Sequence, residues 1–97
     1  MKIIVDGFRI AKGSFTNPDT GLVIDYDNIV FNGRKKPVKD NMYGMESVQV
    51  KIPRKALPDG FSKAEDLMQL LDQKVSFEIE GQDLKSKVYT ASEFDLI

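Results

Sequence analysis

The stretch Glu46–Glu80 reads ESVQVKIPRKALPDGFSKAEDLMQLLDQKVSFEIE, and the spacing of its apolar side chains changes twice. Apolar and polar residues alternate over 46–52 and again over 74–80, which is typical of half-buried strands. Between these runs the apolar spacing becomes helical, so the stretch predicts a strand, a helix and a strand. The apolar residues of the predicted helix face are Ala64, Leu67, Met68 and Leu71, with Leu70 beside them.

The start of this helix carries its own signal. Residues Ser62-Lys63-Ala64-Glu65 fit the capping box, in which the Ser hydroxyl and the Glu carboxylate each accept a hydrogen bond from an unpaired backbone amide. Phe61 precedes the cap, where a hydrophobic staple is expected. We predict one helix of about three turns that ends near Gln73.

Two strand-like runs precede this stretch. Residues 2–16 are rich in Ile, Val and Phe and contain two glycines, so we expect one long strand with a bulge or bend. The turn sequence Asn17–Gly21 joins it to a second strand over 22–33 as a hairpin. Neither parity of the second strand is cleanly apolar, which predicts a bulge near Asp25–Asp27 that switches its inward face.

The remaining segments are a loop, a last strand and a tail. Residues 34–45 form a predicted polar loop. A turn at 81–83 leads to a last strand over 84–91, and the apolar tail Glu93–Ile97 is expected to dock on the protein or on a partner. The phenylalanines expected in the core are Phe8, Phe15, Phe31, Phe61 and Phe77.

The order of these elements predicts the fold class. Five strands with one helix between the third and the fourth is the element order of the OB-fold, a small Greek-key barrel. A long, bent first strand suits such a barrel because it serves both sheets, and the helix would close one end. An SH3-like barrel and a split α+β roll are the alternatives. We predict a mainly β, OB-fold-like single domain over 1–97.

Composition excludes several kinds of chemistry. The chain has 97 residues and contains no His and no Cys. It therefore has no imidazole base, no cysteine nucleophile and no thiolate or imidazole metal ligand. The apolar run at its start is broken by Asp6, too early for a secretory signal or a membrane helix. We expect a cytoplasmic protein with no membrane association, and we predict no cofactor and no metal.

Charge is distributed unevenly along the chain. The formal net charge is −1. Residues 34–55 nevertheless carry seven basic and two acidic groups, whereas residues 56–97 carry four basic and nine acidic groups. Basic groups concentrated in one segment favour a polyanionic partner if the fold places them on one surface.

Residues Gly21–Asn28 read GLVIDYDN, a glycine turn that leads into a strand bearing Tyr26. The chain resembles the small single-stranded DNA-binding, helix-destabilising proteins of filamentous phages, plasmids and other mobile elements. The resemblance covers this feature, the chain length, the predicted order of elements and the lack of catalytic residue types. The resemblance implies an OB-fold, a role in DNA replication and a nucleic-acid contact at Tyr26.

The predicted binding surface combines fold and charge. OB-folds bind oligomers on the face of strands 2 and 3, framed by two loops, and the basic segment falls there. Single-stranded nucleic acid is held by a basic groove and by aromatic rings that stack on bases. The alternation predicts that Lys51 points outward from the third strand. It predicts the same for Lys85, Lys87 and Tyr89 on the last strand. The predicted contacts are Tyr26, Arg34, Lys35, Lys36, Lys39, Tyr43, Lys51, Arg54, Lys55, Lys85, Lys87 and Tyr89.

Three functions fit this pattern. The first is non-enzymatic, sequence-tolerant binding of single-stranded DNA by a homodimer, with RNA as an alternative ligand because it offers the same groups. The second is a protein-binding module that uses the apolar tail or the edge of the last strand, which suits a pI of about 5.4. The third is a metal-dependent nuclease built on Asp25 and Asp27, with Asp6 or Asp19 completing the site.

Overall fold

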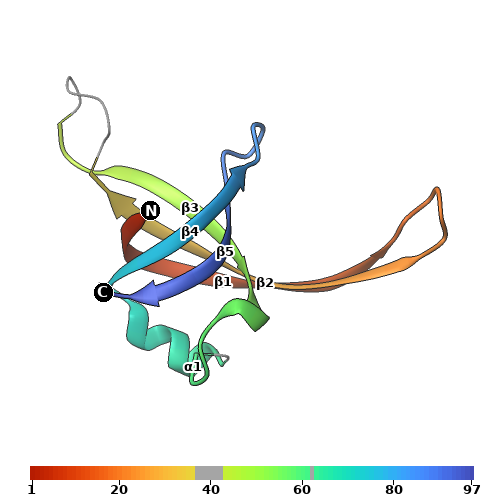
Figure 1. Ribbon diagram of the computed structural model, residues 1–97, viewed down its shortest axis with the longest axis horizontal. Helices are drawn as coiled ribbons and strands as arrows, with labels where there is room; N and C mark the ends of the chain where they lie inside the picture. Colours follow the sequence, from red (N-terminus) through yellow and green to blue (C-terminus); the bar gives the residue numbers. More distant parts are fainter. Residues whose placement is uncertain (37–42, 62) are drawn as a thin grey trace.

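The computed structural model describes residues 1–36, 43–61 and 63–97, and it is mainly β. Its five strands form one sheet that closes in a ring in the order β1-β2-β3-β5-β4 (Figure 1). One short α-helix lies between β3 and β4, as predicted. Within the described ranges, no helix is long and apolar enough to cross a membrane. The elements are β1 (Lys2–Thr16), β2 (Val23–Lys35), β3 (Glu46–Pro53), the 3₁₀ turn η1 (Arg54–Ala56), α1 (Ala64–Leu67), the 3₁₀ turn η2 (Met68–Leu70), β4 (Lys74–Gln82) and β5 (Tyr89–Leu96).

The first strand closes the ring because it pairs with two neighbours. Its first residues pair with β4, and the rest of the strand pairs with β2 in antiparallel register out to Thr16. A bulge between Val5 and Gly7 marks the change of partner. On the other side of the ring, β3 pairs with β5 in parallel through Val50 and Lys51. The remaining neighbouring pairs are antiparallel.

The core fills the inside of the ring. Alternate residues of β3 and β4 are buried, as their sequence pattern predicts. Three rings meet at its centre, where Phe31 lies 5.4 Å from Phe77 and 6.2 Å from Phe94 between centroids. Phe94 was missed as a core residue because it belongs to the predicted tail. Residues 93–96 of that tail form the second half of β5, and the predicted strand over 84–91 overlaps β5 only at 89–91.

The helical segment is shorter than predicted and buries only part of the predicted apolar set, since Leu71 also packs against the core but Ala64 is exposed. Leu67 and Leu70 are buried three residues apart, whereas Met68 is 60% exposed. The segment tightens into a 3₁₀ turn, and the amide of Asp72 then donates to the carbonyl of Val5 at 2.7 Å. Pairing with β1 therefore ends the helix early. Lys63 occupies the N-cap without a side-chain hydrogen bond, and the predicted cap Ser62 lies outside the described residues.

Beyond the pair Ile10–Ile29, β1 and β2 leave the ring as a two-stranded arm (Figure 1). We define the arm as residues 10–27. Its turn is the one predicted: the Gly21 amide donates to the carbonyl of Asn17 at 2.8 Å, and Gly21 takes a φ of 72°. The predicted bulge at Asp25–Asp27 is wrong, since the register there is continuous. Phe15, expected in the core, is 52% exposed near the arm tip, where no other element of the described chain covers the arm.

Candidate nucleic-acid interface

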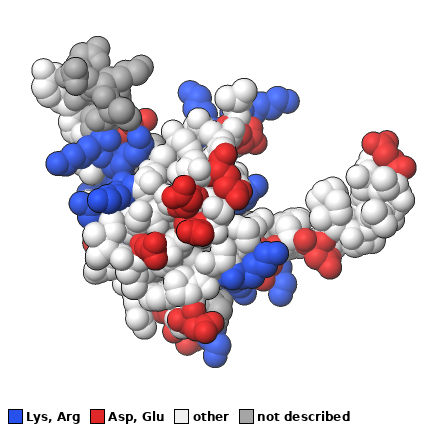
Figure 2. Space-filling model, in the orientation of Figure 1, with Lys and Arg blue, Asp and Glu red and all other residues white. Residues whose placement is uncertain are grey.

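Eight of the predicted contact residues line three separate hollows. The first, which we call the groove, crosses β2 and β3 beside the β4–β5 loop and measures about 300 Å³. The second, the arm-base hollow, lies where the arm meets η1 and measures about 660 Å³. The third, the N-terminal hollow, surrounds the start of β1 and measures about 530 Å³. In the view of Figure 2, basic side chains gather at more than one place on the surface of the molecule.

The groove brings Lys87 and Tyr89 against the outer face of β2 and β3. Tyr89 is half-buried and contacts the core, so its ring is fixed. Asn32 and Gln49 are cross-strand partners on the same face, and Lys51 lies two residues beyond Gln49 on β3. The groove therefore places lysines and an aromatic ring next to neutral polar groups.

One acceptor in the groove is unsatisfied. The side-chain oxygen Oδ1 of Asn32 is buried and has no hydrogen-bond partner among the described residues. Leaving such a group unpaired costs on the order of 1–3 kcal/mol. Because this oxygen has no exposed surface, a base amino or imino group in the groove would reach it only after the Asn32 side chain rotates.

The loop between β4 and β5 has a defined shape. The carboxylate of Asp83 accepts hydrogen bonds from the amides of Lys85 at 2.9 Å and Ser86 at 3.4 Å. These bonds, with a smaller contribution from the charge of Lys51, lower the pKa of Asp83 from its ordinary value. Lys87 takes a left-handed φ of 60°, and its amide donates to the Asp83 carbonyl at 2.7 Å. The loop therefore holds its two lysines in a set geometry.

The structure corrects the predicted setting of these lysines. Lys85 and Lys87 precede β5 and lie in the loop, not on the outward face of a strand. The left-handed backbone at Lys87 is incompatible with a continuous strand. Tyr89 is the first residue of β5, but it pairs with the buried Val50 and packs against the core, so its predicted outward orientation is wrong.

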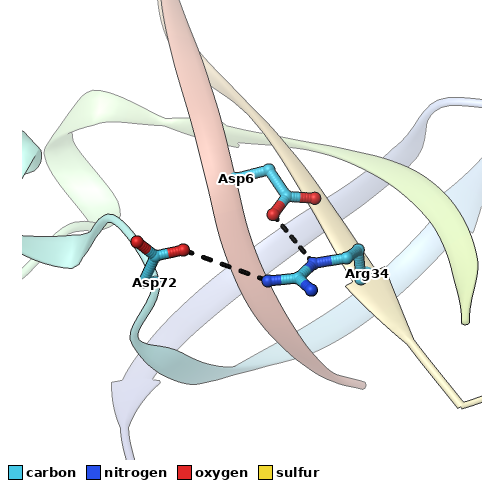
Figure 3. Close-up of polar contacts among 3 residues, drawn as sticks. All are labelled: Asp6, Arg34 and Asp72. Atoms are coloured by element: carbon cyan, nitrogen blue, oxygen red, sulfur yellow. Dashed lines mark hydrogen bonds and ion pairs between the residues drawn. The ribbon is translucent and has the colours of Figure 1, made fainter.

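Two acids that line the groove each have a basic partner. Asp6 receives a hydrogen bond from Arg34 Nε at 2.8 Å, and Asp72 lies 3.9 Å from another nitrogen of the same guanidinium (Figure 3). Lys35 Nζ lies 3.6 Å from a carboxylate oxygen of Glu46. Arg34 and Lys35 belong to β2, not to the predicted loop. Their charges offset Asp6 and Glu46 at the groove, while the carboxylate of Asp83 lies in the adjoining loop and interacts with Lys51.

The arm-base hollow holds Arg54 and Lys55 together with acidic residues. Arg54 Nε lies 3.6 Å from the Asp27 carboxylate, and Asp25 also lines the hollow. Tyr26 lies across the arm from Gly13, and its ring covers that glycine. These cations therefore face carboxylates, a less favourable setting for a phosphate than the groove.

The other predicted contacts lie elsewhere. Lys36 lines the N-terminal hollow, and Tyr43 is 95% exposed. Lys39 lies outside the described residues. Asp25 and Asp27 share one face of the arm, but within the described ranges no group of three or more acidic side chains is placed to hold a metal ion.

Sequence reasoning missed Asn32 as a groove residue. Its signal was present, since Asn32 is a polar residue between the buried Phe31 and Gly33 of β2. No protein-family model, curated protein or solved structure matches the chain in comparison. The argument for a function therefore rests on the ring and the groove.

Proposed function

We propose that the ring is an OB-fold and that the chain binds single-stranded nucleic acid, DNA in the first place, without catalysing a reaction. The strand order, the parallel pairing of β3 with β5 and the helix between β3 and β4 support the fold. OB-folds bind oligonucleotides across strands 2 and 3 next to the loop between strands 4 and 5. The groove occupies that position in this chain.

The observation that carries the proposal is the composition of the groove. Lys51, Lys85 and Lys87 lie on or beside it, within reach of a backbone that crosses the β2–β3 face. Tyr89 offers a ring for stacking on a base, which contributes about 1–3 kcal/mol per base. Asn32 lines the same groove, and rotation of its side chain would present its buried oxygen to a base edge. We assign the phosphates to the lysines and the bases to Tyr89 and Asn32.

The remaining predicted contacts have a secondary place in this proposal. Arg34 and Lys35 act by offsetting acids at the groove, while Arg54, Lys55 and Tyr26 flank a strand that leaves it toward the arm. A groove of this size holds few nucleotides, so a second protomer would raise the apparent affinity through multivalency. We therefore keep the homodimer as part of the proposal.

The test is fluorescence anisotropy with labelled oligo-dT, oligo-rU and a duplex across a series of salt concentrations. We expect dT to bind more tightly than the duplex, with log K falling as log salt rises. Each phosphate contact contributes about −0.7 to that slope for a single strand. The double variant Lys85→Gln/Lys87→Gln should make the slope less negative by about 1.4. Affinity that does not change with salt would overturn the proposal.

A matched control separates local from overall charge. Lys12 and Lys63 are exposed lysines that line none of the three hollows, so Lys12→Gln/Lys63→Gln removes the same charge without touching the groove. We expect this variant to retain the slope of the parent protein. Tyr89→Leu should weaken binding to all sequences alike while leaving the slope unchanged. Equal losses from both lysine pairs would mean that only the net charge matters.

A protein-binding module is the second candidate, and the exposed apolar arm favours it. Phe15, Leu22 and Val23 are each more than half exposed. The tail is less suited to the role than the sequence suggested, because Phe94 is buried in the core. A partner that remains bound to the full chain after nuclease and high salt would support this function.

A further inference from the structure

The arm has one apolar and one polar face, and beyond its base at Asp27 no other element of the described chain covers it. On one face, Phe15 pairs with Ile24 and Gly13 with Tyr26, whereas the other face carries the pairs Lys12–Asp27 and Ser14–Asp25. Leu22, 65% exposed, adjoins the apolar face at the tip, and Val23, also 65% exposed, pairs with Thr16 on the other face. A two-stranded ribbon alone is marginally stable in water, so this surface favours an external cover.

The charge of the arm identifies the chemistry of that cover. Residues 10–27 contain one lysine and three aspartates, including Asp19 in the turn at the tip. A net negative, apolar tip repels a polyphosphate and suits a surface that is apolar and basic. This rules against a nucleic-acid strand as its occupant.

The N-terminal hollow has the complementary character. Met1, Ile4 and Met45 give it an apolar lining, and Met45 is 47% exposed. Five basic side chains also line it: Lys2, Arg34, Lys35, Lys36 and Lys74. Ion pairs among the described residues involve Arg34 and Lys35 but not the other three. At about 530 Å³, it is large enough to take the side chains of a ribbon tip.

Each chain carries both halves of this match, on different sides of the ring. The molecule is 48 Å long, and the arm tip forms one end of the long axis with the chain N-terminus across the ring from it (Figure 1). We infer that the arm tip of one copy docks in the N-terminal hollow of a second copy. Such a contact joins unlike surfaces, so it leaves a tip and a hollow open for further copies. It is separate from the groove and does not depend on the proposed function.

Cysteine cross-linking tests the contact directly, because the chain has no cysteine of its own. Thr20→Cys marks the arm tip and Met45→Cys marks the hollow, each as a single variant of the full chain. Glu80→Cys, an exposed position near the far end of β4 from the hollow, is the control. The variants are mixed in pairs without nucleic acid and treated with a short bis-maleimide.

The proposal requires a mixed dimer from Thr20→Cys with Met45→Cys at about ten times the yield of Thr20→Cys with Glu80→Cys. Dimers formed mainly by Thr20→Cys alone would overturn it in favour of an arm-to-arm contact. Yields no higher than the control would overturn it in favour of a different partner.

Sedimentation velocity provides an independent readout. The exposed-site variants Phe15→Ser/Leu22→Ser and Lys36→Glu/Lys74→Glu should each weaken self-association about tenfold or more while the circular dichroism spectrum is retained. Added salt should weaken association of the parent protein, because part of the match is electrostatic. Self-association unchanged in both variants would contradict the contact.

Discussion

Strands β1 and β2 build two different structures along their length. The parts of β1 and β2 that belong to the ring bury side chains in the core. Val5 and Phe31 there have no exposed surface. In the arm, the same two strands remain paired in register, yet both faces meet solvent. Backbone pairing is thus continuous, while side-chain burial stops where the other strands stop. The ring is held by its core, and the arm only by its ladder and cross-strand pairs.

The largest effect is expected when one phenylalanine in each region is replaced by alanine. Phe31→Ala removes a ring that meets two others in the core and should lower the free energy of unfolding by about 3–5 kcal/mol. Phe15→Ala removes a half-exposed ring on the arm and should change it by less than about 1 kcal/mol. Urea titration at low protein concentration measures both, since self-association would add to apparent stability.

Phe31→Ala can leave the chain unfolded, because small domains have only about 5–15 kcal/mol of stability. Phe31→Leu covers that case, with an expected loss below about 1.5 kcal/mol for a substitution closer in volume. Equal losses at positions 15 and 31 would show that the arm is packed as tightly as the ring.

A second test uses two glycines of the same strands. A Cβ at Gly33 would lie 2.7 Å from the carbonyl oxygen of Ile4, a backbone atom that the closed ring holds in place. Gly33→Ala should therefore destabilise the protein by about 1–3 kcal/mol. A Cβ at Gly13 would meet the Tyr26 hydroxyl at 2.7 Å, the far end of a side chain on the open arm.

Tyr26 can move away into solvent, so Gly13→Ala should be within about 0.5 kcal/mol of the parent protein. Thermal unfolding of the two variants side by side measures the contrast. A large loss at Gly13 would mean that the Tyr26 ring is fixed in place, by the arm itself or by a second copy. Dilution separates these causes, since only the second depends on concentration.

The same contrast explains how much of the fold the sequence could predict. The alternation of β3 and β4 was read correctly because the core buries one face of each strand. The bounds of β1 were also correct, and its glycines predicted the bulge at Val5–Gly7. Alternation in β2 misled at Asp25–Asp27 because the arm has no inward face there. Burial, not pairing, produces the pattern.

The groove was predictable only in part. Lys51 lies on the exposed face of β3 as expected, whereas Tyr89 packs against the core beside Val50. Lys85 and Lys87 are placed by a turn that depends on the Asp83 carboxylate and a left-handed residue. Alternation does not report such a turn. The contact between Asp6 and Arg34 joins residues 28 positions apart and depends on a bulge and a strand register. These features follow from the closed ring and cannot be read from local sequence.

The smallest expected effect concerns pH at the β4–β5 loop. The pKa of Asp83 is lowered in the folded protein. The ionised carboxylate therefore stabilises the conformation of the β4–β5 loop, and this contribution is fully present above the ordinary pKa of 3.8. That contribution falls as pH decreases through the lower, folded pKa. We expect the amide resonances of Lys85 and Ser86 to shift together in this acid range, while global unfolding changes little because the group is exposed.

Asp83→Asn is the matched variant for this titration, since its side-chain oxygen still accepts hydrogen bonds but does not titrate. It should remove the acid-dependent shift of both amides and keep the loop conformation at neutral pH. Because the loop positions two groove lysines, Asp83→Ala should also weaken dT binding more than Asp83→Asn does. Equal binding by the two variants would show that the lysines reach phosphates without the turn. The groove would then resemble the arm, a surface whose side chains are not held in place by the fold.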